Sequence, residues 1–196
     1  MLANIEALAL GYLIGNIQFA VILSHVMHKD DVRNHGSGNA GSTNMLRVYG
    51  KLAGILTFAG DILKGVLGVV IGRLLGGEVC ACFGALGVVL GHCYPAFFGF
   101  HGGKGAASSL GAITALNPLF GGIVTLIVVI VAAITKTVSA ASLAGTLGYL
   151  IMCLIWGSKA NKLLAVALFT IIYLRHKENI IRIIKGSEGK LLDKDK

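Results

Sequence analysis

"GAASSLGAITALNPLFGGIVTLIVVIVAAIT", residues 105–135, is the stretch that decides the fold of this chain. It is almost entirely apolar, too long for one membrane-spanning helix of about 20 residues and short for two. An Asn-Pro step followed by paired glycines interrupts it at 117–122, and such a cluster is a strong turn signal. The stretch therefore predicts a hairpin of two helices.

The rest of the chain has the composition of a membrane protein. Of 196 residues, 55% are hydrophobic and 13% are charged, and the mean hydropathy is +0.80. A soluble domain averages about 25% charged residues, so lipid is the expected solvent. The 28 glycines suit a membrane bundle, because small residues allow helix backbones to approach closely. Clear candidate spans lie at about 3–27, 52–75, 78–99, 138–157 and 161–175.

Charge distribution gives the orientation. With the hairpin there are seven spans, and the loops at 28–51, 100–104 and around 136 share one face with the tail after 174. That face carries Lys29, Arg33, Arg47, Lys51, Lys104, Lys136 and seven basic residues of the tail, whereas the opposite face keeps Arg73, Lys159 and Lys162. The chain is therefore expected to be a single-domain (1–196), all-α polytopic membrane bundle. The positive-inside rule predicts that its N-terminus lies outside and its C-terminus in the cytoplasm.

The first polar segment, "HGSGNAGSTNMLRVYG" (35–50), resembles an anion-binding loop. Glycine-rich turns expose successive backbone N–H groups, and the arginine guanidinium grips a phosphate with a planar fork. Although its glycines spell G-x-G-x-x-G, no strand precedes them, so a dinucleotide site is not expected. The candidate substrate-binding residues are Ser37, Gly38, Asn39, Thr43, Asn44 and Arg47.

A second glycine-rich segment, "HGGKGAASS" (101–109), lies on the same predicted face. It presents Gly102, Gly103 and Lys104 at a helix start, where N–H groups favour an anion. Ser139, Ser142 and "RHKEN" (175–179) follow on that face. Four polar segments converging on one side predict a shared site for an anionic substrate rather than merely solvated loops. The net charge of +8 agrees with anionic partners, and nucleic acid is not expected.

Charged residues inside an apolar run form the next clue. Asp61 and Lys64 are three residues apart and face the same way on a helix, so an internal ion pair is expected. We favour a pair that braces the site over direct contact with substrate. His92 is either a satisfied interior histidine or a donor that supports the site. No His or Cys spacing is typical of a metal site, so neither a metal nor a cofactor is expected.

Five segments together resemble one known family, the bacterial acyl-phosphate:glycerol-3-phosphate acyltransferases of the inner membrane. The segments are "GSGNAGSTNMLRVYG" (36–50), "GDILKG" (60–65), "GHCYPAFFGFHGGKG" (91–105), "VSAASLAG" (138–145) and "LRHKENIIRIIKGSE" (174–188). Members are similar in length and are seven-span bundles with their polar motifs at the cytoplasmic face.

The resemblance implies a reaction. The 1-hydroxyl of sn-glycerol 3-phosphate attacks the carbonyl of a long-chain acyl phosphate, giving lysophosphatidate and inorganic phosphate, the first step of membrane phospholipid synthesis. At matching positions Ser37, Arg47 and Lys104 would hold phosphate. Ser142, His176 and Asn179 would orient glycerol phosphate and are the candidate catalytic residues. The implied partners are both substrates, membrane lipid and an upstream enzyme that forms acyl phosphate. His101 departs from the family, which commonly has lysine there.

Acyl phosphate is an activated mixed anhydride, so the protein chiefly has to position two anions and stabilise the developing oxyanion. The proton acceptor stays open between the departing phosphate and His176, which as a base would give a pH limb near 6 to 7. A transporter or channel for small organic phosphates is the alternative function. It is disfavoured because the halves show no inverted repeat and the polar residues gather at one face.

Overall fold

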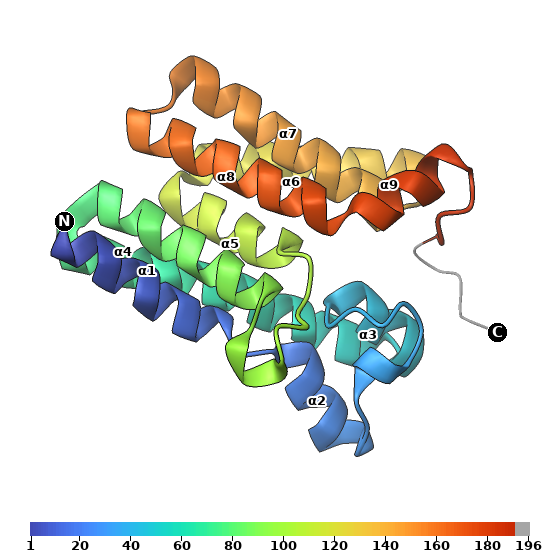
Figure 1. Ribbon diagram of the computed structural model, residues 1–196. Helices are drawn as coiled ribbons and strands as arrows, with labels where there is room; N and C mark the ends of the chain where they lie inside the picture. Colours follow the sequence, from blue (N-terminus) through green and yellow to red (C-terminus); the bar gives the residue numbers. More distant parts are fainter. Residues whose placement is uncertain (191–196) are drawn as a thin grey trace.

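The computed structural model describes residues 1–190, and the regular elements within that range are all helices (Figure 1). The predicted all-α class is confirmed, while the last six residues of the basic tail, 191–196, lie outside the described residues. The elements are α1 (Leu2–Gly15), α2 (Phe19–His28), η1 (Val32–Asn34), α3 (Ser42–Tyr49), α4 (Lys51–Cys93), η2 (Ala96–Phe98), α5 (Ala106–Leu116), α6 (Pro118–Thr135), α7 (Val138–Trp156), α8 (Lys159–Arg175) and α9 (Lys177–Ile184).

Helix α4 is a hairpin of two arms that correspond to the predicted spans 52–75 and 78–99. The backbone leaves the helical conformation at Gly76 and Gly77, and Gly77 has a φ of 74°, which favours glycine. The second arm ends at Cys93, earlier than predicted, because the residue before Pro95 is disfavoured in the helical region.

Glycine contacts bring α1 and the two arms of α4 to close range. A Cβ on Gly11 of α1 would collide with the backbone of Gly84 in the second arm, and one on Gly84 would collide with Gly68 in the first arm. Close backbone approach of this kind is how membrane helices gain packing where lipid supplies no hydrophobic drive.

The predicted first run, 3–27, is divided in the structure into α1 and α2. Asn16 and Gln18 lie between them and are buried. The Asn16 amide donates to the Tyr12 carbonyl at 2.7 Å, and the Gln18 amide donates to the carbonyls of Gly91 and His92. Side chains that bond to nearby backbone compete with helix continuation, which explains the break.

The predicted turn at 117–122 is present, but the two helices it joins are unequal. The Asn117 side chain caps α6 by accepting from the Phe120 N–H, and Pro118 is the first helical residue. Helix α5 has 11 residues, a length of roughly 16 Å. The glycine loop before α5 therefore reaches into the bundle, where Gly105 lies against Val89 and Ile172.

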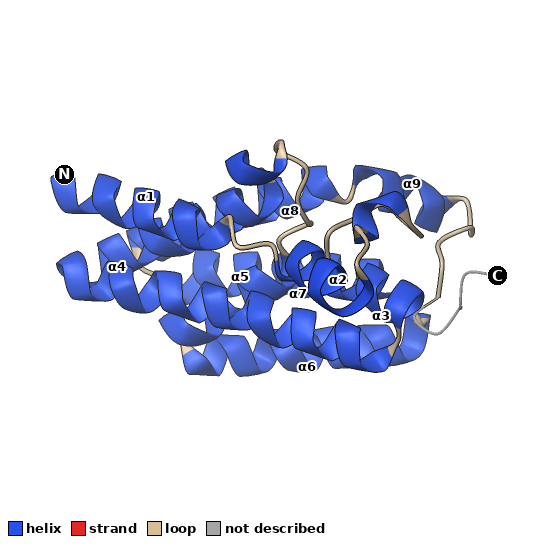
Figure 2. Ribbon diagram, turned by 90° about the horizontal axis from the view of Figure 1, so that it is seen from below, coloured by secondary structure: helices blue, strands red, loops and turns tan. Residues whose placement is uncertain are grey.

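Four segments of the described chain are long and apolar enough to cross a membrane: Leu2–His28, Lys51–Phe98, Pro118–Thr135 and Val138–Trp156. Most side chains of α6 are exposed on the outside of the bundle, as a lipid-facing helix requires. The N-terminus lies at one end of the bundle and α3 and α9 lie at the other (Figures 1 and 2). The predicted polar segments therefore gather at the end opposite the N-terminus.

Candidate active site

A cavity of about 690 Å³ lies at that end of the bundle. Its walls come from the loop before α3, the loop before α5, the first half of α7, the junction of α8 with α9, and the tail after α9. The predicted site residues that line it are Ser37, Gly38, Asn39, Thr43, Asn44, Arg47, Asp61, His92, Gly102, Lys104, Ser139, Ser142, His176 and Asn179. Two predicted residues, Gly103 and Lys64, lie behind the wall and touch residues that form it.

The loop before α3 is shaped by Asn44. Its Oδ1 accepts from the Ser37 N–H at 3.0 Å, and its Nδ2 donates to the carbonyls of Val32 and His35 at 3.1 and 3.0 Å. Gly36 and Gly38 have positive φ, which glycine adopts readily. The Asn44 amide is thus engaged with the loop backbone, and it holds the Ser37 side of the loop at the cavity.

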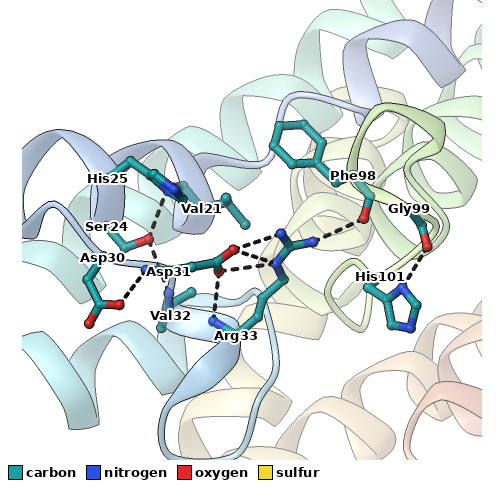
Figure 3. A network of polar contacts seen from close by, with 10 residues as sticks. All are labelled: Val21, Ser24, His25, Asp30, Asp31, Val32, Arg33, Phe98, Gly99 and His101. Atoms are coloured by element: carbon teal, nitrogen blue, oxygen red, sulfur yellow. Dashed lines mark hydrogen bonds and ion pairs between the residues drawn. The ribbon is translucent and has the colours of Figure 1, made fainter.

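A second network, not anticipated from the sequence, joins this loop to the loop before α5 (Figure 3). Arg33 makes an ion pair of 2.7 Å with Asp31 and donates to the Phe98 carbonyl at 3.0 Å. Hydrogen bonds from Arg33 hold the pKa of Asp31 below its ordinary value, despite its partial burial. His101, the departure from the family, bonds through Nδ1 to the Gly99 carbonyl at 2.6 Å and lines the cavity.

Lys104 stands at the start of α5. Burial lowers the pKa of its ammonium to about 8, and the nearby Glu188 carboxylate opposes this shift. The ammonium donates to Asn179 Oδ1 at 2.5 Å. Helix α5 has no side-chain cap at Gly105, so the first-turn N–H groups and Lys104 together favour an anion.

Glu188 was not anticipated as a site residue. Its carboxylate accepts from Ser139 Oγ and Asn179 Nδ2, both at 2.6 Å, and from Arg182 Nε at 2.8 Å. Burial alone would raise the pKa of Glu188, but these hydrogen bonds outweigh it and lower the pKa. The tail so anchored also contacts Arg47, whose Nη2 donates to the carbonyls of Gly189 and Lys190.

His176 lies between α8 and α9. Its Nδ1 bonds to the Ile172 carbonyl at 2.8 Å, so this nitrogen carries the proton and Nε2 remains an acceptor. Burial lowers the pKa of His176 to about 4, although the bond to Ile172 opposes the shift. The imidazole is therefore neutral at pH 7. Ser142, also on the cavity wall, donates to the Val138 carbonyl.

The expected ion pair between Asp61 and Lys64 is present, with 2.9 Å between Oδ1 and Nζ. Lys64 also donates to His92 Nδ1 at 2.7 Å and to the Ile17 carbonyl at 2.9 Å. The pair thus ties α4 to the end of α1, as a brace would. In the described residues, no three His, Cys, Asp or Glu side chains are grouped to hold a metal ion.

The far part of the cavity is apolar. Ile113 of α5, Val124 and Val128 of α6, and Gly145 of α7 line it. A Cβ on Gly145 would collide with the side chain of Val128, so glycine at this position allows α6 and α7 to pack closely. The cavity thus combines a polar, cationic end with an apolar end between helices.

This fold and cavity define a class: a multi-pass integral membrane protein with a cationic, amphipathic cavity at one end of its helix bundle. The model of the glycerol-3-phosphate acyltransferase family matches residues 5–186. The chain belongs to that family.

Relatives with this description are similar along nearly the whole chain. The protein of Thermoanaerobacter pseudethanolicus is 42% identical over 183 residues, which cover 93% of this chain and 92% of the relative. That of Neisseria meningitidis serogroup A is 40% identical over 97% of this chain and 98% of its own length. The crystal structure of PlsY, an integral membrane glycerol 3-phosphate acyltransferase, in its glycerol 3-phosphate form has a TM-score of 0.90 and 34% identity, covering 95% of this chain and 94% of that one. Its lysophosphatidic acid form has a TM-score of 0.87 and 33% identity over the same shares.

Proposed function

We propose that this protein transfers a fatty acyl group from an acyl phosphate to the 1-hydroxyl of sn-glycerol 3-phosphate, giving lysophosphatidate and inorganic phosphate. The observation that carries the proposal is the two-ended cavity. Its cationic end suits two phosphate-bearing reactants, and its apolar end suits one fatty chain. The relatives and solved structures described above support the same acceptor and product.

In this proposal Ser37, Arg47 and Lys104 bind phosphate. Ser142, His176 and Asn179 orient the glycerol group, with Ser139 beside them, and the acyl chain occupies the apolar end between α5, α6 and α7. All of these residues line the one cavity. The uncapped start of α5 and Lys104 supply positive potential where charge grows on the departing phosphate.

The chemistry needs one proton acceptor. The glycerol hydroxyl oxygen forms a bond to the acyl carbon, the bond from that carbon to the phosphate oxygen breaks, and the hydroxyl proton must leave. His176, with its pKa lowered to about 4, is a weak base at neutral pH. We therefore assign the proton to the departing phosphate and give His176 Nε2 the role of accepting a hydrogen bond from the substrate.

We further propose that the chain is a single domain with seven spans: α1, the two arms of α4, α5, α6, α7 and α8. The site then lies at the cytoplasmic face of the bacterial inner membrane, with the N-terminus outside. The support is the basic loops and tail that gather at the cavity end. An enzyme that forms acyl phosphate would be the upstream partner.

The test is an assay of the purified protein in lipid with labelled glycerol 3-phosphate, offering palmitoyl phosphate and palmitoyl-CoA in parallel. We expect lysophosphatidate from the acyl phosphate alone. Product from palmitoyl-CoA alone would overturn the proposed donor. Product from neither, with protein shown to be folded, would overturn the enzyme, and uptake of glycerol 3-phosphate into sealed vesicles would then identify a transporter.

A further inference from the structure

The loop that presents Lys104 has two consecutive glycines, Gly102 and Gly103, directly before the lysine. A Cβ on Gly102 or Gly103 would collide with His92, at the end of α4. Packing thus requires glycine at both positions, and glycine is the residue with the greatest backbone freedom. Some other group has to fix the orientation of these peptide planes.

Arg175, the last residue of α8, makes the contacts that do so. Its Nε donates to the Gly103 carbonyl at 3.2 Å, and its Nη2 donates to the Gly102 carbonyl at 3.1 Å. The Gly103 N–H in turn donates to the His92 carbonyl at 3.0 Å. The guanidinium also lies 5.2 Å from the ring centroid of Tyr94, the residue that follows α4.

Arg175 also lines the cavity, but its Nε and Nη2 are both engaged with backbone carbonyls. Its fork is directed at two consecutive backbone carbonyls, so the guanidinium binds these two oxygens beside the start of α5. Carbonyl oxygens turned into the cavity would repel a phosphate. An arginine fork matches two neighbouring acceptors, and a lysine ammonium does not offer that planar pair of donors.

We propose that Arg175 is a positioning residue, which clamps the Gly102–Gly103 carbonyls so that Lys104 and the first turn of α5 face the substrate phosphate. The proposal rests on the proposed acyl transfer for its kinetic consequence. It assigns to α8 a second task besides carrying His176: setting the shape of a loop more than 70 residues earlier in the chain.

The test compares Arg175→Ala, Arg175→Lys and Arg73→Ala. Arg73 is the matched control, because its Nη2 also donates to backbone carbonyls, those of Ala115 and Leu116 at the opposite end of α5. We expect both Arg175 variants to lower kcat roughly 10- to 100-fold, as loss of a charge-assisted contact implies. The KM for glycerol 3-phosphate should change less, because Lys104 and the start of α5 act chiefly where charge grows on the departing phosphate. Arg73→Ala should keep the wild-type kcat.

A second measurement is independent of turnover. Hydrogen exchange of the amides of residues 101–106 should become faster in Arg175→Ala and stay unchanged in Arg73→Ala. Wild-type kcat in Arg175→Lys would overturn the clamp, as would an equal loss in Arg73→Ala or unchanged exchange in Arg175→Ala. If the wild-type protein forms no lysophosphatidate from either donor, the proposed function fails, and the exchange measurement still decides the role of Arg175.

Discussion

At the scale of single residues, one of the two ring nitrogens of His176 is already hydrogen-bonded without substrate, since its Nδ1 donates to a backbone carbonyl. If His176 were the base with an ordinary pKa, a pH limb near 6 to 7 would follow, but burial lowers the pKa of this histidine to about 4. We predict that kcat/KM falls as pH drops through about 4, where protonation removes the Nε2 acceptor. The measurement is a pH profile of wild type and His176→Gln.

The second ionisation of a phosphate monoester, near pH 6, supplies the control. A limb near 6 that survives in His176→Gln belongs to glycerol 3-phosphate and agrees with the prediction. A limb at 6 to 7 that disappears in His176→Gln would contradict it and make His176 the base.

Lys104 sets the alkaline side of the profile. Its pKa is lowered to about 8, so the free enzyme loses this charge as pH rises through 8, and kcat/KM should fall there. Lys104→Arg keeps its charge to above pH 12 and should lose that limb, whereas Lys104→Met should be less active at every pH. An alkaline limb at the same pH in Lys104→Arg would assign it to another group.

In the proposed site, Arg47 is expected to bind phosphate. Replacement by alanine removes a charge-assisted contact worth about 1.5–3 kcal/mol, so the KM for glycerol 3-phosphate should rise roughly 10- to 150-fold. Arg47→Lys should recover part of the loss because it keeps the charge. If kcat and KM of Arg47→Ala both equalled the wild-type values, Arg47 would not belong to the site.

At the scale of elements, the Asp61–Lys64 pair holds α4 to α1. Lys64→Met leaves the Asp61 carboxylate buried without its cation, and removes the bonds to the carbonyls that end α1. We predict a loss of stability of about 3–5 kcal/mol, which a double variant Asp61→Asn with Lys64→Met should partly restore. Thermal unfolding in lipid or detergent measures both; a single variant as stable as the wild type would exclude the brace.

Local patterns predicted the elements better than their lengths. The turn signal at 117–122 located the break between α5 and α6, because Asn117 and Pro118 act within one helical turn. The lengths of other runs were less well predicted: the run 3–27 forms two helices, and the span expected to reach 99 ends at Cys93. A single polar residue such as Gln18 changes the mean hydropathy of an apolar run very little, yet Gln18 lies at the break between α1 and α2.

The candidate site was predictable for similar reasons. Short glycine-rich motifs indicated the loops before α3 and α5 from local composition alone. Glu188 and Arg175 lie in segments that the sequence singled out, but their roles were not predicted because they act on partners distant in the chain: Glu188 on Ser139, and Arg175 on Gly102 and Gly103. Only the packing of α8 and α9 against the loops brings these groups together.

At the scale of the whole molecule, the proposed orientation in the membrane makes a direct prediction. We predict that a reporter fused after Lys196 is active only in the cytoplasm, because the basic loops and tail share the cavity end. A fusion between Gly157 and Ser158, which join α7 to α8 at the other end, is the matched control and should report outside. Activity of the Lys196 fusion outside the cell would invert the proposed topology.

The shortness of α5 has one more consequence. Because α5 has 11 residues, about half of an ordinary span, the glycine loop before it lies inside the bundle, next to the apolar residues of α6 and α7 that line the cavity. In the proposed reaction, water-soluble glycerol 3-phosphate enters through the polar end of the cavity, whereas the acyl phosphate enters from the bilayer between the helices. Two reactants with opposite solubilities thus meet without either leaving its own phase, and the free-energy barrier of moving a fatty chain through water never arises.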